Sequence, residues 1–158
     1  MQRDPCVEDT SPMINASAKP LRSMRLAPLR VLADTQALAS VVGRELLASR
    51  RFSRRLAVLI VRLNATAEPA LMLAMGERLR GRLRAGDLAF QLGEDGFGVL
   101  LLGAATALTI QRRLLKALSG PYGVDGQLLN VSLRIGVAEN PEADVSGAAL
   151  VLRAEPAD

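Results

Sequence analysis

The chain has 158 residues, of which 49% are hydrophobic, so it is long enough and apolar enough to bury the core of one domain. It carries 20 basic and 16 acidic residues, a net charge of +4, and only 3% aromatic residues. A positive excess this small, with few side chains on which bases could stack, argues against a nucleic-acid-binding protein. The lack of histidine excludes a histidine base or metal ligand, and the lone Cys6 excludes an internal disulfide or a cysteine-based zinc site.

The N-terminal region contains acidic residues and proline but no apolar segment of the kind found in signal peptides. No run of about 18 apolar residues is present to span a membrane. We therefore expect a cytoplasmic protein without direct membrane insertion. Residues 1–24 show no periodicity and are predicted to form a flexible tail, and residues 25–158 are predicted to form a single domain.

Hydrophobic spacing predicts an alternation of helices and strands along this domain. Helices are expected at about residues 35–49, from Pro69 to about Arg84, at about 105–118 and in the last dozen residues. Strands are expected at 56–63, 88–92, 97–102 and 128–138, with a small hairpin turn at Asp125-Gly126. The order β-α-β-β-α-β, preceded by a helix, predicts an α+β, ferredoxin-like fold in which flanking helices cover one face of a mixed, mainly antiparallel sheet.

Three stretches of the chain carry a resemblance to a known family. They are LAVLIVRLN at 56–64, ERLRGRLRAGDLAFQLGEDGFGVLL at 77–101 and GPYGVDGQLLNVSLRIGVA at 120–138. In this order they resemble the GGDEF domain of diguanylate cyclases, and the likeness covers roughly residues 27–150. It implies a nucleotidyl-cyclase-type fold. Members of the family join two GTP molecules into cyclic di-GMP, using carboxylates that hold magnesium and glycines that approach phosphate closely.

The signature turn of the family departs from its pattern in this chain, where it reads Gly93-Glu94-Asp95-Gly96-Phe97. Glu94 replaces a glycine and adds bulk and negative charge where the triphosphate of GTP should lie. Asp95 keeps an acid at the third position, but Gly96 replaces the acid expected at the fourth. The resemblance therefore predicts that one magnesium-binding carboxylate is missing from the turn.

The end of the first long strand departs in the same direction. The resemblance places a magnesium-binding aspartate at Arg62 and a further aspartate at Asn64. An arginine donates hydrogen bonds only and cannot ligate a metal ion. The segment after Asn64 is also too short for the guanine-binding elements of the family. We predict a protein with no catalytic residues, no metal site and no magnesium cofactor, in which Arg62 forms an ion pair with Glu94 or Asp95.

A second motif of the family is present at the expected distance from the turn. In many members an Arg-x-x-Asp motif, five residues before the signature turn, binds cyclic di-GMP, and Arg84 and Asp87 have this spacing. The resemblance implies that Arg84 donates to the guanine O6/N7 edge or to phosphate and that Asp87 accepts from the guanine N1–H and N2–H₂ groups. Arg80 and Arg55 are predicted as additional phosphate contacts. An ordinary surface ion pair between Arg84 and Asp87 is the alternative interpretation.

Together these features predict a degenerate GGDEF domain that serves as a cyclic di-GMP receptor. The printed sequence includes no separate output domain, so we expect the signal to pass to a protein effector, through a homodimer or a ligand-bridged dimer. The main alternative is a ligand-independent interaction scaffold built on an inactive GGDEF fold. A residual enzyme or GTP sensor is a third alternative, and it would require magnesium-dependent GTP binding.

Overall fold

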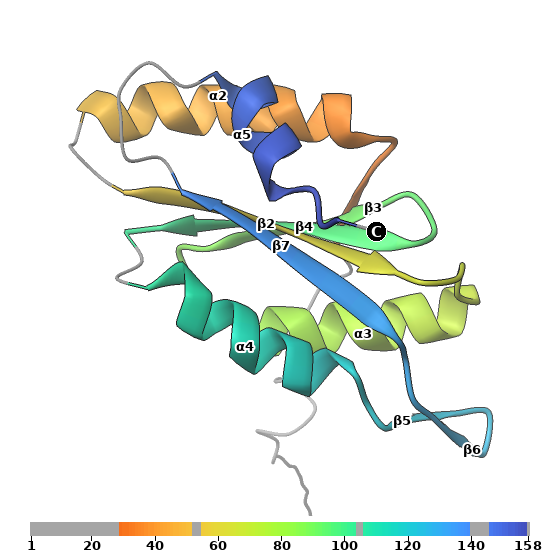
Figure 1. The fold of residues 1–158 in the computed structure, drawn as a ribbon. Helices are drawn as coiled ribbons and strands as arrows, with labels where there is room; N and C mark the ends of the chain where they lie inside the picture. The colour runs from red at the N-terminus through yellow and green to blue at the C-terminus, as the bar shows by residue number, and fades with distance from the viewer. Residues whose placement is uncertain (1–28, 52–54, 104–105, 140–145, 158) are drawn as a thin grey trace, which may run out of the picture.

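The structure is a computed structural model that describes residues 29–51, 55–103, 106–139 and 146–157, apart from the side chains of residues 50 and 51. The predicted flexible tail at 1–24 lies outside these residues. Figure 1 shows a central sheet with helices on both sides. The sheet has five strands in the order β1 (Arg30–Leu32), β3 (Leu88–Leu92), β4 (Gly96–Leu102), β2 (Leu56–Leu63) and β7 (Leu133–Glu139).

The sheet is mixed, as predicted. Its four longer strands pair antiparallel, whereas β1 pairs parallel with β3, with Arg30 opposite Phe90. The central strands β2 and β4 are almost continuous runs of buried residues. A strand whose two faces are both apolar must be covered on both sides. This requirement explains the layered arrangement of the helices.

Helices α3 (Pro69–Gly81) and α4 (Ala107–Leu118) cover one face of the sheet, and α2 (Thr35–Arg51) and α5 (Gly147–Ala154) cover the other (Figure 1). The two helices inside the β-α-β-β-α-β unit thus share one face, as predicted. The prediction that helices cover only that face was wrong. Alternate residues of β2 pack on opposite faces of the sheet, since Leu59 belongs to one apolar cluster and Val58 to the other. Both faces are therefore apolar and both need helices to cover them.

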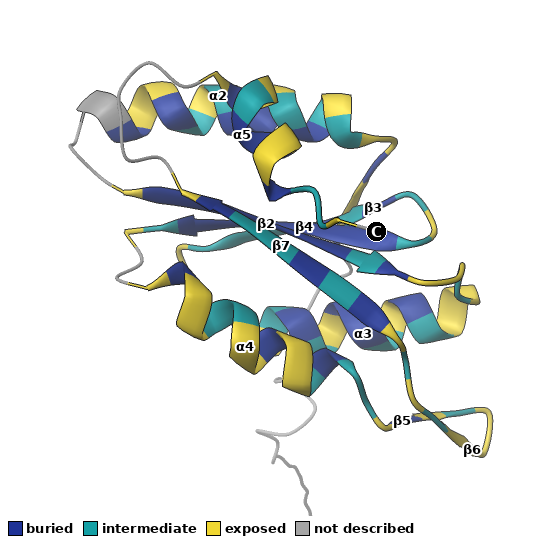
Figure 2. Cartoon of the chain, in the orientation of Figure 1, coloured by how far each residue is buried: buried dark blue, intermediate teal, exposed yellow. Residues whose placement is uncertain are grey.

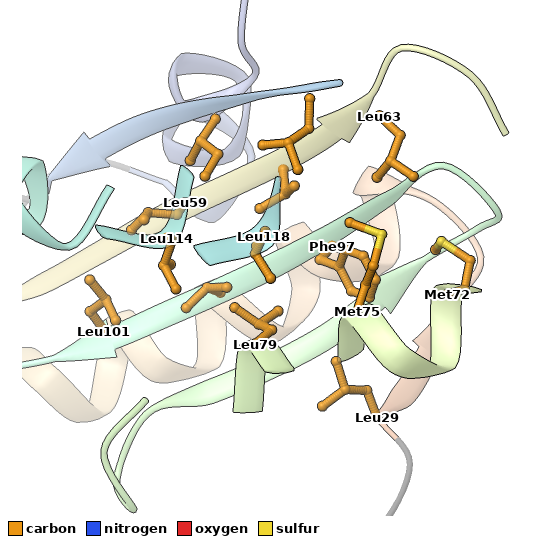
Figure 3. Close-up of a cluster of buried hydrophobic side chains, with 14 of the residues drawn as sticks. Leu29, Leu59, Leu63, Met72, Met75, Leu79, Phe97, Leu101, Leu114 and Leu118 are labelled. Carbon is orange, nitrogen blue, oxygen red and sulfur yellow. The ribbon is translucent and has the colours of Figure 1, made fainter. Parts of the chain in front are cut away.

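Two hydrophobic clusters fill the space between the sheet and its helices, and burial follows the inward-facing surfaces (Figure 2). The cluster under α3 and α4 includes Met75, Leu79 and Phe97, whose side chains converge in Figure 3. The cluster under α2 and α5 includes Leu38, Ile60 and others. Both clusters are mainly aliphatic, as the low aromatic content requires.

Three predicted boundaries need correction. The strand predicted at 128–138 is two strands: β6 (Gln127–Leu129) pairs with β5 (Tyr122–Val124) in a separate hairpin, and β7 begins at Leu133. The turn of that hairpin is at Asp125-Gly126, as predicted, and both residues have positive φ, as tight hairpins require. Helix α3 ends at Gly81, three residues before the predicted end at Arg84. Strand β4 begins at Gly96, one residue early, because Gly96 pairs with Leu92.

Tyr122, the only tyrosine of the chain, gives a test of this packing. Its buried hydroxyl donates to the carbonyl of Leu118 at 2.7 Å, and burial raises its pKa above the ordinary 10.0, although the Arg78 guanidinium opposes this shift. The neutral form is favoured in the folded state, so this contribution to stability is complete below the unfolded pKa and is lost as pH rises through the folded pKa. Titration of the tyrosinate absorbance should give a midpoint above 10.0 in the native chain and a lower one in urea. A native midpoint equal to or below the urea value would contradict the packing.

Candidate functional site

The Arg84–Asp87 motif forms a tight turn between the end of α3 and the start of β3. The Asp87 N–H donates to the Arg84 carbonyl at 3.0 Å, and the Arg84 N–H donates to Asp87 Oδ2 at 3.0 Å. Gly86 is not among the described glycines with positive φ, and no atom lies within 4 Å of a Cβ built on it. The turn therefore does not depend on a glycine at this position. The carboxylate of Asp87 closes the turn instead.

The Asp87 side chain is buried, with 3% of its surface exposed. Its Oδ2 accepts from the Arg84 backbone, and its Oδ1 accepts from the Leu102 N–H at 3.3 Å. Oδ1 also lies 3.6 Å from Nη2 of Arg84. Asp87 thus connects the turn to the end of β4 and holds the arginine of the same motif. Contact of Asp87 with guanine stays a prediction.

The Arg84 side chain is anchored at one nitrogen and otherwise faces solvent. Nη2 donates to the Leu102 carbonyl at 3.0 Å, while 62% of the side chain is exposed. The ion pair between Arg84 and Asp87 that the alternative interpretation expects is present, and it is combined with two bonds to the end of β4. This arrangement fixes one terminal nitrogen of the guanidinium while most of the side chain stays exposed.

A hollow of about 360 Å³ lies beside the motif. Its charged lining residues are Arg30, Arg80, Arg84 and Asp87, and its apolar ones are Leu83, Ala85, Leu88, Ala89 and Phe90. The Nε atom of Arg80 is the one buried side-chain nitrogen or oxygen without a hydrogen-bond partner in the part of the chain that the structure describes. Buried polar atoms in proteins are almost always paired, so an unpaired donor on a residue that lines the hollow is unusual.

Only some of the predicted ligand residues line the hollow. Arg80 and Arg84 line the same hollow, as an α3 residue and the turn that follows it should. Arg55 does not line it, and its carbonyl accepts from the Gly103 N–H at 2.8 Å. Sequence reasoning missed Arg30, because β1 is too short to show a pattern and reaches the hollow only by pairing with β3. The only local feature of the sequence that could have indicated Arg30 is its positive charge on a short edge strand.

The turn between β3 and β4 consists of residues 93–95, the first three of the five residues that the resemblance assigns to the signature turn. Gly93 has a φ of 56°, and its N–H donates to the Leu32 carbonyl at 3.1 Å. The Asp95 carbonyl accepts from the Leu63 N–H at 2.7 Å, which attaches the turn to the end of β2. Phe97 is fully buried in the core under α3 and α4. The aromatic residue of the signature is therefore a packing residue.

Arg62 lies at the end of β2, beside this turn, and it is held by two carboxylates. Its Nη1 donates to Asp95 Oδ1 at 3.3 Å, and its Nε and Nη2 donate to Glu155 at 2.7 and 3.1 Å. The bond to Glu155 is the main cause that raises the pKa of Arg62, against the opposing effect of burial. The predicted pair with Asp95 is present. Glu155, just after α5, was missed because it lies at the far end of the sequence.

Gly96 and Asn64, where the resemblance predicts departures from the family pattern, are also closely packed or hydrogen-bonded. A Cβ on Gly96 would lie 2.6 Å from the Val61 carbonyl and 3.0 Å from Nη1 of Arg62. Asn64 donates to the Ser132 hydroxyl and accepts from Nε of Arg134 at 3.1 Å. In the described ranges, no group of three or more His, Cys, Asp or Glu side chains is arranged to hold a metal ion. Nor does any described helix have the length and apolar character needed to cross a membrane.

Comparison with curated proteins gives the first independent information on identity. Diguanylate cyclase TpbB of Pseudomonas aeruginosa is 36% identical over 100 residues. The match covers 61% of this chain but only 23% of TpbB, so the chain spans less than a quarter of that protein. The shared region is therefore one part of TpbB.

Solved structures agree at the level of the fold. The GGDEF domain of TpbB (YfiN) superposes with a TM-score of 0.67 at 27% identity, covering 80% of this chain and 85% of the domain. A sensory box/GGDEF family protein from Caulobacter crescentus has a TM-score of 0.67 at 24% identity, covering 82% of this chain and 90% of the other. The family model described as "Diguanylate cyclase, GGDEF domain" matches residues 65–157, more than half of the chain. This chain belongs to the GGDEF domain family of diguanylate cyclases.

Proposed function

We propose that this GGDEF domain is a receptor for cyclic di-GMP and that it does not synthesise the molecule. The observation that carries the proposal is the Arg84–Asp87 turn. Its arginine is anchored on the Leu102 carbonyl and exposed beside a hollow lined by two further arginines. Arginine forms bidentate hydrogen bonds to the guanine O6/N7 edge and to phosphate, and cyclic di-GMP offers both.

The lack of synthesis is supported by the ion pairs of Arg62. Its guanidinium binds Asp95 and Glu155 at the position where the family resemblance expects a magnesium-binding carboxylate. The guanidinium occupies both carboxylates that could ligate a metal ion, and arginine itself offers no lone pair to a metal. Gly96 supplies no carboxylate, and the backbone leaves no room for a side chain there. The turn is therefore proposed to be a structural ion-pair cluster.

Signalling by a receptor without catalytic output requires a second molecule. We propose that the liganded domain acts in the cytoplasm on a protein effector, through a homodimer or a ligand-bridged pair of domains. The exposed position of Arg84 supports this step, because a ligand bound there would remain accessible to a second surface. Relatives that carry the same family name, such as diguanylate cyclase TpbB, are named as enzymes, so activity is the property on which this chain is proposed to differ.

Replacement of Arg84 by alanine tests the receptor function. Loss of its bidentate contact is expected to weaken cyclic di-GMP binding by about 1–3 kcal/mol, roughly 5- to 150-fold in the dissociation constant. Isothermal titration of the native chain and of Arg84→Ala measures the change, with Arg112→Ala as control because Arg112 is exposed on α4 and does not line the hollow. Equal binding by wild type and Arg84→Ala would contradict the proposal.

The alternative function, a scaffold that needs no ligand, makes the opposite prediction in the same experiment. A scaffold would give no heat with cyclic di-GMP, and partner capture would be equal with and without the nucleotide. The retained position of Arg84 at the hollow favours the receptor. A surface ion pair alone contributes only about 0–1 kcal/mol, and it does not require an adjacent arginine-lined hollow.

A further inference from the structure

We infer that a basic groove between α3 and α4 is the docking surface for an acidic helix of a protein partner. The groove has a volume of about 550 Å³, and its charged lining residues are Arg78, Arg82, Arg113 and Lys116. That a protein effector exists rests on the proposed function, whereas the chemistry of the contact is inferred from this groove. The partner it assigns is a helix that carries carboxylates along one face.

The charge of the groove is of one sign. Its lining contains four cations and no carboxylate. Arg82, Arg113 and Lys116 are exposed, and within the described ranges none of these side chains has a salt bridge or a hydrogen bond. A surface that docks here must therefore supply negative charge, because an apolar or basic surface would leave these cations without a counter-charge.

Arg78 joins the two sides of the groove. Its Nη1 donates to the Ala117 carbonyl and its Nη2 to the Pro121 carbonyl, both at 3.0 Å. Its guanidinium also lies 4.0 Å from the centre of the buried Tyr122 ring. These contacts connect α3 to the last turn of α4 and to the segment after it, so the cations of the two helices are held at a fixed separation.

The spacing of the cations favours a helical partner. Arg78 and Arg82 are four residues apart, and Arg113 and Lys116 are three apart, so each pair lies along one side of its own helix. At a rise of 1.5 Å per residue, these separations are about 4.5–6 Å along the helix axis. Carboxylates three or four residues apart on a partner helix repeat at the same distance. An acidic helix laid along the groove can therefore face both pairs.

Other occupants fit the groove less well. The lining contains no aromatic side chain on which a base could stack, and the nearby Tyr122 is only 2% exposed, so a single-stranded nucleic acid would have charge contacts alone. A second copy of the same groove would bring like charges together. These two features favour the carboxylates of a protein.

The groove is separate from the hollow at the Arg84–Asp87 turn. The two share no lining residue. Arg80, which lines the hollow, is two residues from Arg78, and side chains two apart on a helix do not face the same way. A partner at the groove and a ligand at the hollow can therefore be tested independently.

Fluorescence anisotropy of the full chain with two labelled peptides tests the docking surface. Both peptides are alanine–glutamate helices of equal length and charge, but one carries its glutamates along a single face and the other carries them all around. We expect the one-faced peptide to bind about fivefold tighter or more, with an affinity that falls as salt is added. The double variant Arg82→Glu/Lys116→Glu should weaken its binding about tenfold or more, because two attractions become repulsions.

Arg44→Glu/Arg153→Glu is the matched control. It changes the net charge by the same amount, and both residues are exposed on α2 and α5, which cover the opposite face of the sheet (Figure 1). Charges that far from the groove are largely screened, so this variant should bind the one-faced peptide within about twofold of wild type. Urea denaturation confirms that each variant is folded.

The outcomes separate this inference from the proposed function. If the one-faced peptide binds and only Arg82→Glu/Lys116→Glu loses it, but cyclic di-GMP does not bind, the docking surface stands and the receptor function fails. If cyclic di-GMP binds but the folded chain binds neither peptide, the receptor function stands and the docking surface is overturned. Equal binding of the two peptides, or equal loss in the two double variants, reveals attraction by net charge alone and also overturns it. Tighter binding of inorganic pyrophosphate than of the one-faced peptide, lost in Arg82→Glu/Lys116→Glu, assigns the groove to phosphate and overturns the acidic helix.

Discussion

Replacement of Phe97 by alanine is expected to lower the free energy of unfolding by about 3–5 kcal/mol. The Phe97 side chain has no exposed surface and packs in the cluster that also contains Met75 and Leu79 (Figure 3). Truncation would remove its buried apolar surface and leave a cavity, because the closely packed core between the sheet and the helices relaxes only in part. Urea denaturation followed by far-ultraviolet circular dichroism measures the change.

Leu115 provides the matched control for this substitution. It lies on α4, as part of the same layer, but its side chain is exposed. Leu115→Ala should change the free energy of unfolding by less than about 0.5 kcal/mol. A loss below about 1 kcal/mol in Phe97→Ala would show that Phe97 is not a core residue and would reopen a ligand-binding role for the signature turn.

Gly136 is the position where adding a single methyl group should have the next largest effect. A Cβ on Gly136 of β7 would overlap the backbone carbonyl of Ala154, the last residue of α5. Backbone atoms cannot rotate away as a side chain can, so Gly136→Ala should force α5 from the sheet and lower the free energy of unfolding by about 3 kcal/mol. Glu155 follows Ala154, so the displacement should also separate Glu155 from Arg62.

Gly81→Ala is the control, because nothing lies within 4 Å of a Cβ at this position on the last turn of α3. Alanine is a better helix former than glycine, so this variant should be as stable as wild type or more so. Thermal or urea denaturation of both variants makes the comparison. Equal stability of Gly136→Ala and Gly81→Ala would mean that α5 does not pack on β7 as described.

The parts of the fold with a strong local pattern could be predicted from sequence. The continuous apolar run of β2 and the helical spacing of α2 are visible within single segments. Strand β1 could not be found in this way, since its three residues become a strand only through pairing with β3. The break between β6 and β7 was missed for a similar reason, because it depends on which strand each segment pairs with.

The candidate site shows the same division between local and long-range information. Arg84 and Asp87 are three residues apart, so the ion pair that the sequence offered as the alternative interpretation is local, and it is present. Arg30 and Glu155 enter the two polar clusters from opposite ends of the chain, and no local motif marks either residue. The role of the Asp87 carboxylate also depends on the Leu102 backbone, which only the folded sheet places nearby.

Two sites at opposite ends of β4 differ in their chemistry. At the signature turn, Arg62 and two carboxylates form a closed ion-pair cluster. At the Arg84–Asp87 turn, an anchored arginine remains exposed beside a positively charged hollow. We propose that the first arrangement disfavours magnesium and GTP and that the second favours an anionic ligand that offers guanine and phosphate groups.

Isothermal titration of the wild-type chain with cyclic di-GMP, in parallel with GTP plus magnesium, tests this contrast most directly. We expect saturable binding of cyclic di-GMP, at micromolar or tighter concentrations, and no heat of binding with magnesium and GTP. Saturable binding of magnesium-GTP, or no binding of cyclic di-GMP to a chain shown to be folded, would contradict it.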